Sequence, residues 1–240
     1  MKKLRILNFF PRLIKSVFTG SVVFWGGRDG LGVLSDTTNL KFFKNELKNE
    51  EIINILSDIK HRIFPRPFER LSGLENKKSL VGAEIGVAGG EHAESLLDNL
   101  DIRKLYLIDP YLIYKDYDEG KRVYGISQLD LDETEKRARN KLNKYSNKLV
   151  WLKKLSVHST KEICDLLDFV YIDGNHEYEY VRKDIESFYP LLKSGGIIGG
   201  HDFYNGYADH DGVINAVTEF SVKLKLVLKV ELPDWWLEKP

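Results

Sequence analysis

The chain has 240 residues, of which 42% are hydrophobic and 30% are charged. This composition is typical of a globular protein and excludes a disordered or fibrous chain, and the length fits one ample domain or one domain with an extension. The 36 basic and 36 acidic side chains cancel, so no net charge recruits nucleic acid or an anionic membrane. The single cysteine, Cys164, excludes an internal disulfide and a thiolate zinc site, and its apolar surroundings predict a buried position.

Residues 1–39 form an expected extension before the main domain. Residues 1–23 are basic and amphipathic, but Pro11, Arg12 and Lys15 interrupt the apolar run, which excludes a transmembrane helix and a clear signal peptide. We expect this arm to pack on its own domain, with contact to a membrane surface or a partner as the alternative. Residues 20–38 are rich in Gly and Asp and predict a loop. The cytoplasm is the expected location.

Residues 40–240 have the alternating pattern of an α/β domain. Apolar residues at helical spacing predict a lead-in helix over residues 40–63, which Pro65 and Pro67 end. Short apolar runs predict five buried strands, over Leu80–Ile85, Lys104–Ile108, Leu149–Leu152, Asp168–Ile172 and Gly196–Gly199. The helices predicted between them span Glu91–Asn99, Leu131–Tyr145, Thr160–Leu166 and Tyr178–Leu192. This alternation predicts parallel strands with helices on both faces of the sheet.

The last 40 residues predict a helix and two further strands. The helix is expected near Val213–Phe220, and the strands over Lys225–Glu231 and Trp235–Glu238. The two strands are expected to form a terminal antiparallel hairpin, with Trp235 and Trp236 as core and edge of the last strand. In such a sheet, ligands lie beyond the carboxyl ends of the strands. Functional residues should therefore follow the strands directly.

A glycine-rich turn follows the first of these strands, over residues 84–91. A dinucleotide fingerprint would need Gly at the positions of Gly86, Ala88 and Glu91, so two of its three places fail. A GxxxxGK[ST] phosphate loop is absent from the sequence as well. The acidic neighbours suit a ligand with a cationic or amine-bearing end, which Glu84 could hold. The alternative is a tight turn that binds no ligand.

The second strand ends at Asp109 and Pro110. An acidic residue at this place grips a ribose through its hydroxyl groups in many nucleotide-binding sheets, and the spacing of 25 positions from Glu84 fits loosely. The alternative is that Asp109 only caps a turn, because Asp-Pro favours turns.

Glu84, the glycine turn and Asp109 together resemble the class I S-adenosylmethionine-dependent methyltransferases. Within that class, the run Glu84-x-Gly86-Val87-x-Gly89-Gly90 is most similar to the macrocin O-methyltransferase and cephalosporin-hydroxylase-like group of sugar O-methyltransferases. The resemblance covers residues 80–238. It implies a Rossmann-like fold, with a mostly parallel seven-stranded sheet, helices on both faces and a C-terminal antiparallel hairpin. It also implies S-adenosylmethionine as cofactor, contacted by Glu84, Gly86, Val87, Ala88, Gly89, Gly90, Asp109, Pro110, Ser156, Val157 and Asp173.

The fourth and fifth strands end in a set of acids and imidazoles, namely Asp173, His176, His201 and Asp202. Hard divalent cations prefer carboxylate oxygens, which Asp173 and Asp202 can supply. An imidazole with an ordinary pKa suits a general base, which makes His176 the candidate. The resemblance implies Asp173, His201 and Asp202 as ligands of Mg²⁺ or another divalent cation, with Asp173 and His176 as catalytic residues. The family commonly has an acid where His201 stands.

The long connection after Asp109 carries tyrosines that suit a substrate lid, because tyrosine rings stack on sugars and other ring-shaped acceptors. A solvated loop is the alternative. We expect the acceptor to be bound by Tyr111, Tyr114, Tyr117, Tyr178 and Tyr204.

These features predict O-methylation of a hydroxyl on a small acceptor, a sugar or a glycoside, by an enzyme that can form homo-oligomers and binds no nucleic acid. Two alternatives stay open. One is a non-haem iron oxygenase that uses His176, His201 and Asp202 as a facial triad. The other is a metabolite-binding module without chemistry.

Overall fold

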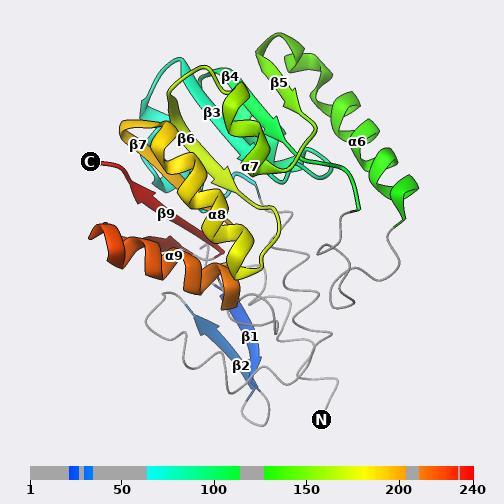
Figure 1. The fold of residues 1–240 in the computed structure, drawn as a ribbon. Helices are drawn as coiled ribbons and strands as arrows, with labels where there is room; N and C mark the ends of the chain where they lie inside the picture. The colour runs from blue at the N-terminus through cyan, green and yellow to red at the C-terminus, as the bar shows by residue number, and fades with distance from the viewer. Residues whose placement is uncertain (1–21, 27–29, 35–63, 114–126, 204–210, 232) are drawn as a thin grey trace.

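The computed structural model describes residues 22–26, 30–34, 64–113, 127–203, 211–231 and 233–240 (Figure 1). The main sheet contains β3 (Leu80–Ile85), β4 (Ile102–Ile108), β5 (Leu149–Leu152), β6 (Leu167–Ile172), β7 (Leu192–Gly200), β8 (Lys229–Glu231) and β9 (Asp234–Glu238). The helices are α4 (Pro67–Leu71), α5 (Glu91–Asn99), α6 (Gln128–Leu142), α7 (Ser156–Ser159), α8 (Tyr178–Phe188) and α9 (Asp211–Leu224).

The seven strands pair in the order β5-β4-β3-β6-β7-β9-β8. The first five are parallel, whereas β9 is antiparallel to both β7 and β8. In chain order, β4 and β5 are added on one side of β3, and β6 and β7 are then added on the other side. The topological switch point, where the strand order reverses, therefore lies between β3 and β6, and ligands of such sheets bind at this point.

Alternating side chains of the strands pack into two separate layers. Val170 and Ile172 of β6 belong to the core beneath α8 and α9, which lie side by side over one face of the sheet (Figure 1). Phe169 and Tyr171 of the same strand belong to the other core, with residues of α4 and α5. This alternation with a period of two is what a strand covered on both faces requires. The expected Rossmann-like fold with its terminal antiparallel strands is confirmed.

The tryptophans of β9 follow the same alternation. Trp235 packs in the core beneath α8 and α9, and Trp236 packs in the core on the opposite face rather than at an edge. Among the described residues, none of the helices combines the length and the apolar character needed to cross a bilayer.

Three local expectations are wrong. The predicted helix over Thr160–Leu166 is replaced by the shorter α7 and a 3₁₀ turn over Thr160–Glu162. Cys164, which follows that turn, is exposed rather than buried. The stretch 20–38, expected to be a loop, contains an antiparallel pair of strands, β1 (Val22–Gly26) and β2 (Gly30–Leu34). The Val and aromatic residues of β1 favour a strand, but the glycines on either side of them favour a loop prediction.

The expected helix over residues 40–63 and most of the tyrosine-bearing connection, residues 114–126, lie outside the described residues. The same is true of residues 1–21, which include most of the basic arm.

Candidate active site

Three neighbouring strands end level with one another at the carboxyl edge of the sheet. Ile85 of β3 pairs with Ile172 of β6, and Ile172 pairs with Gly200 of β7. The backbone continues the pairing by one residue, because Asp173 N donates to Ile85 O at 2.7 Å and His201 N donates to Ile172 O at 3.0 Å. The residues that follow the three strands are therefore brought together although they are far apart in sequence.

The glycine turn lies directly against the backbone of Asp173. Gly86 has a φ of +86°, and a Cβ atom at this position would stand 2.0 Å from the carbonyl oxygen of Asp173. A residue with a side chain cannot be accommodated there without displacing the main chain, because real Cβ atoms do not approach so closely. The structure thus brings the glycine turn beside the loop that carries the acidic and histidine side chains.

Asp109 supports the glycine turn from the end of β4. Its Oδ2 atom accepts hydrogen bonds from Val87 N and Ala88 N, both at 3.0 Å, and its Oδ1 atom accepts one from Tyr111 N at 2.9 Å. Tyr111 is buried, and its hydroxyl donates to Ala88 O at 2.8 Å. Burial raises the pKa of Asp109, and the hydrogen bonds from these backbone donors offset only part of that rise. A carboxylate has about four acceptor positions, so Asp109 retains capacity for a ligand hydroxyl.

Glu84 is placed inside the protein rather than at the surface of the turn. Its side chain is 1% exposed, and Oε1 lies 2.8 Å from Nδ1 of His92 on α5. Burial raises the pKa of Glu84 well above its ordinary value. Its other oxygen, Oε2, has no hydrogen-bond partner among the described residues.

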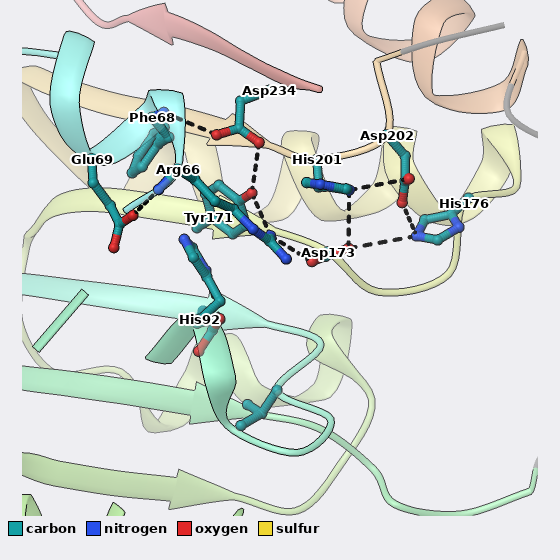
Figure 2. A network of polar contacts seen from close by, with 12 residues as sticks. Arg66, Phe68, Glu69, His92, Tyr171, Asp173, His176, His201, Asp202 and Asp234 are labelled. Atoms are coloured by element: carbon teal, nitrogen blue, oxygen red, sulfur yellow. Dashed lines mark hydrogen bonds and ion pairs between the residues drawn. The ribbon is translucent and has the colours of Figure 1, made fainter. Parts of the chain in front are cut away.

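The acids and imidazoles form one contiguous centre (Figure 2). His176 Nε2 lies 2.7 Å from Asp202 Oδ2 and 3.7 Å from Asp173 Oδ1. His201 Nδ1 lies 3.1 Å from Asp202 Oδ1 and 4.0 Å from Asp173 Oδ1. Ligand atoms of Asp173, His201 and Asp202 all fall within 4.8 Å of one another, which is the spacing of a divalent-cation site.

The charges in this centre favour ionised carboxylates and a protonated imidazole. Burial lowers the pKa of His176, but the Asp202 and Asp173 carboxylates reverse that effect and raise it to about 10. Burial likewise opposes ionisation of Asp202, yet His176 and His201 hold its pKa well below the ordinary value. His176 therefore carries a proton at neutral pH in the structure described, instead of having the ordinary imidazole pKa on which its assignment as a base was founded.

Arg66, which precedes α4, reaches the same centre, although no sequence motif marks it as a site residue. Its Nη1 atom donates to Asp173 Oδ2 at 2.9 Å and to the Tyr171 hydroxyl at 2.7 Å. Tyr171 in turn donates to Asp234 Oδ1 at 3.0 Å (Figure 2). An arginine between two prolines, Pro65 and Pro67, was the available signal, because Pro67 starts α4 and fixes the approach of the chain.

The other predicted site residues have varied positions. Ser156 opens α7 and donates from its hydroxyl to Asp184 Oδ1 of α8, and Val157 follows it. The Tyr178 hydroxyl donates to Glu219 of α9 at 2.6 Å, away from the acids of the centre. Three tyrosines expected at the acceptor, Tyr114, Tyr117 and Tyr204, lie outside the described residues.

The sheet order and the terminal antiparallel strands define a Rossmann-like methyltransferase fold. A family described as a methyltransferase domain matches residues 83–203, which is half of the chain, and the chain belongs to that family. Among curated proteins, the uncharacterized protein R132 of Acanthamoeba polyphaga mimivirus is 27% identical over 173 residues, which cover 67% of this chain and 71% of that protein.

Solved structures share the fold at low sequence identity. A Staphylococcus aureus protein provisionally assigned as a caffeoyl-CoA O-methyltransferase has a TM-score of 0.53 and 14% identity, over 84% of this chain and all of its own. The O-methyltransferase NovP has a TM-score of 0.51 and 17% identity, over 78% of this chain and 80% of its own. SMU.1697c of Streptococcus mutans, provisionally assigned as a methyltransferase and solved with SAH, has a TM-score of 0.50 and 15% identity, over 74% of this chain and 99% of its own.

Proposed function

We propose that the protein is an S-adenosylmethionine-dependent O-methyltransferase that acts on a hydroxyl group of a small acceptor, a sugar or a glycoside. Family membership supports methyl transfer. The observation that carries the proposal is the contact of Gly86 with the backbone of Asp173. It sets the turn that would receive the cofactor beside the groups that would activate the acceptor, and methyl transfer needs both reactants in line and about 3 Å apart.

The cofactor would lie along the ends of β3 and β4. The glycine turn offers its backbone to the methionine part, and Asp109 offers its remaining acceptor position to a ribose hydroxyl. Ser156 and Val157, after β5, are the candidates for the adenine side. Glu84, with His92 beside it, is the candidate for the amine-bearing end of the cofactor. The SAH bound by SMU.1697c, which has the same fold, supports this choice of cofactor.

The acceptor hydroxyl would be activated at the acid and histidine centre. An alcohol is a poor nucleophile until its proton leaves, so a base is required at the oxygen. His176 is the candidate, but it can accept a proton only after it loses the one that Asp202 and Asp173 stabilise. Another positive charge on those carboxylates would lower the pKa of His176 and release that proton.

The donor set fits a divalent cation. Asp173, His201 and Asp202 offer two carboxylates and one imidazole at suitable spacing, a mixed oxygen and nitrogen set that suits Mn²⁺, Fe²⁺ and Zn²⁺ better than Mg²⁺, which prefers oxygen ligands. A bound cation would supply the charge that acidifies the acceptor hydroxyl. The oxygenase alternative would use a different set, His176, His201 and Asp202, and membership of a methyltransferase family favours methyl transfer over it.

Calorimetric titration with S-adenosylmethionine and with S-adenosylhomocysteine tests the cofactor assignment. We expect Asp109→Ala to lose at least about tenfold in affinity, because ribose contacts of this kind contribute roughly 1.5–3 kcal/mol. Asp101→Asn, at an exposed carboxylate, is the matched control and should bind as the wild type does. Equal affinity in the wild type and Asp109→Ala would refute the assignment.

Transfer of a labelled methyl group to a panel of sugars and glycosides, with Mg²⁺, Mn²⁺ or chelator, tests the reaction. We expect His176→Gln to lower turnover by roughly 100-fold or more while cofactor affinity stays the same. Turnover close to that of the wild type would show that His176 is not the base. Cofactor binding without methylation of any acceptor in the panel would favour the binding-module alternative.

A further inference from the structure

Asp173 is held by a buried chain of hydrogen bonds that starts outside the family region. Arg66 precedes that region and Asp234 follows it, whereas the family match spans residues 83–203. Tyr171 lies between them and contacts both. We name the three residues Arg66, Tyr171 and Asp234 the clamp (Figure 2).

The two carboxylate oxygens of Asp173 face different partners. Oδ2 accepts the 2.9 Å hydrogen bond from Arg66, and Oδ1 faces the imidazoles, 3.7 Å from His176 Nε2 and 4.0 Å from His201 Nδ1. A carboxylate without a partner on Oδ2 could rotate about its Cβ–Cγ bond. The guanidinium restricts that freedom, because Nη1 donates to Oδ2 in a direction set by the planar group and by its second bond, to Tyr171.

Arg66 itself is held rigidly. Its side chain is buried, its Nη1 atom bonds the Tyr171 hydroxyl at 2.7 Å, and its backbone N–H donates to Glu69. Asp234 fixes the far end, because Oδ1 accepts from Tyr171 at 3.0 Å and Oδ2 accepts from Phe68 N, in α4, at 2.9 Å. The segment that carries Arg66 is thus tied to β9 on one side and to β6 on the other.

A contact that only stabilised the fold would not need the charges of Arg66 and Asp173. Taking a guanidinium and a carboxylate out of water costs as much as their attraction returns, so packed apolar side chains stabilise a core equally well. The charged pair does supply a fixed orientation to a carboxylate whose Oδ1 atom faces both imidazoles. We therefore infer that Arg66, braced by Tyr171 and Asp234, is a positioning residue that sets the orientation of Asp173 toward His176 and His201.

The inference rests on the proposed function for its chemical consequence, because orientation of Asp173 matters if that carboxylate acts in methyl transfer. Its test needs no acceptor, cofactor or cation. A failure of the clamp and a failure of the proposed function can therefore be told apart.

The experiment records the histidine ring nitrogen resonances of the full ¹⁵N-labelled chain in the presence of chelator, with assignments from single His→Gln variants. Arg66→Lys keeps the charge but loses the planar fork, and Tyr171→Phe removes the brace while it leaves Arg66 in place. Arg70→Lys, at an exposed arginine of α4, the helix that Arg66 precedes, is the matched control. His158 is exposed on α7 and is the internal reference.

We expect the His176 and His201 resonances to shift in Arg66→Lys, to shift less in Tyr171→Phe, and to stay in place in Arg70→Lys, with His158 unmoved throughout. Thermal unfolding of each variant is measured alongside. Resonances at the wild-type positions in both clamp variants would overturn the inference, whether or not the melting temperature falls. A shift of His158 together with the other two would show a general loss of structure and would overturn it as well.

Discussion

Nε2 of His176 lies 2.7 Å from Oδ2 of Asp202, a side chain with no exposed surface. This pair accounts for most of the electrostatic character of the centre, because a buried carboxylate at this distance strongly favours the protonated imidazole. The same pair explains why an imidazole that the sequence marks as a base is protonated in the structure.

Replacement of Asp202 tests that relationship directly. In Asp202→Asn, we expect the pKa of His176 to fall from about 10 toward 6.5, because the main stabilising charge is lost while burial, which lowers the pKa, remains. Titration of the His176 resonances by NMR, with chelator present, measures the change. Asp101→Asn is the control, and a His176 pKa near 6.5 already in the wild type would contradict the expectation.

Cation binding should be coupled to proton release. If Asp173 and Asp202 take up Mn²⁺, the charge that holds the proton on His176 is neutralised, so about one proton per cation is expected to leave at pH 7.5. Calorimetry in two buffers of different ionisation enthalpy gives the number of protons released.

His176→Gln serves as the matched variant for that measurement. It retains the three ligands Asp173, His201 and Asp202, so it should still bind the cation but release no proton. Binding heats of the wild type that do not depend on the buffer would show that the two events are not coupled.

The close approach of Gly86 to Asp173 should be visible in stability. We expect Gly86→Ala to lower the free energy of unfolding by roughly 2–4 kcal/mol, because the new methyl group collides with backbone and the positive φ is strained. Urea denaturation measures the loss. Gly195→Ala shares the positive φ, +70°, but has open space around it, and should lose only about 1–2 kcal/mol. Equal losses in the two variants would mean that the collision contributes nothing.

Asp184 should make stability fall with rising pH. Burial raises its pKa to about 7, and the Ser156 hydroxyl lowers it only in part. The folded state therefore binds more protons than the unfolded state between the ordinary pKa of 3.8 and about 7. Stability contributed by the neutral form is present below that range and is lost as the pH rises through it, by up to about 4 kcal/mol.

Asp184→Asn removes the titration and keeps an acceptor for Ser156. We expect the variant to be more stable than the wild type at pH 8 and equal to it near pH 4, as measured by urea denaturation across that range. Glu133→Gln, at an exposed carboxyl group, should follow the wild type at every pH. A constant difference between wild type and Asp184→Asn at all pH values would contradict the assignment.

Much of the sheet follows from short-range patterns. Apolar runs bounded by polar or turn residues locate β3, β5 and β6 to within a residue. Helix starts are less secure. The start of α6 was expected at Leu131, whereas a capping box of Ser127 and Asp130 begins it at Gln128.

The candidate site was predictable only where its residues follow strands. Asp173, His176, His201 and Asp202 all do, and the structure brings them together. Arg66 and His92 lie on separate elements, and their approach to Asp173 and Glu84 depends on how α4 and α5 pack on the sheet. The sequence also does not predict the protonation of His176, because its pKa depends on the Asp202 and Asp173 carboxylates, which only the fold brings beside it.

The level ends of β3, β6 and β7 tie the chemistry of this protein to its packing. If β6 slipped by one residue past β3, Tyr171 and Ile172 would each move to the opposite face of the sheet. The Tyr171 hydroxyl would then lie in the apolar core beneath α8 and α9. Asp173 would be carried out of reach by the same movement. The packing of the core and the alignment of the reacting groups therefore depend on the same strand register. Any constraint that maintains the core packing also maintains the alignment of the site.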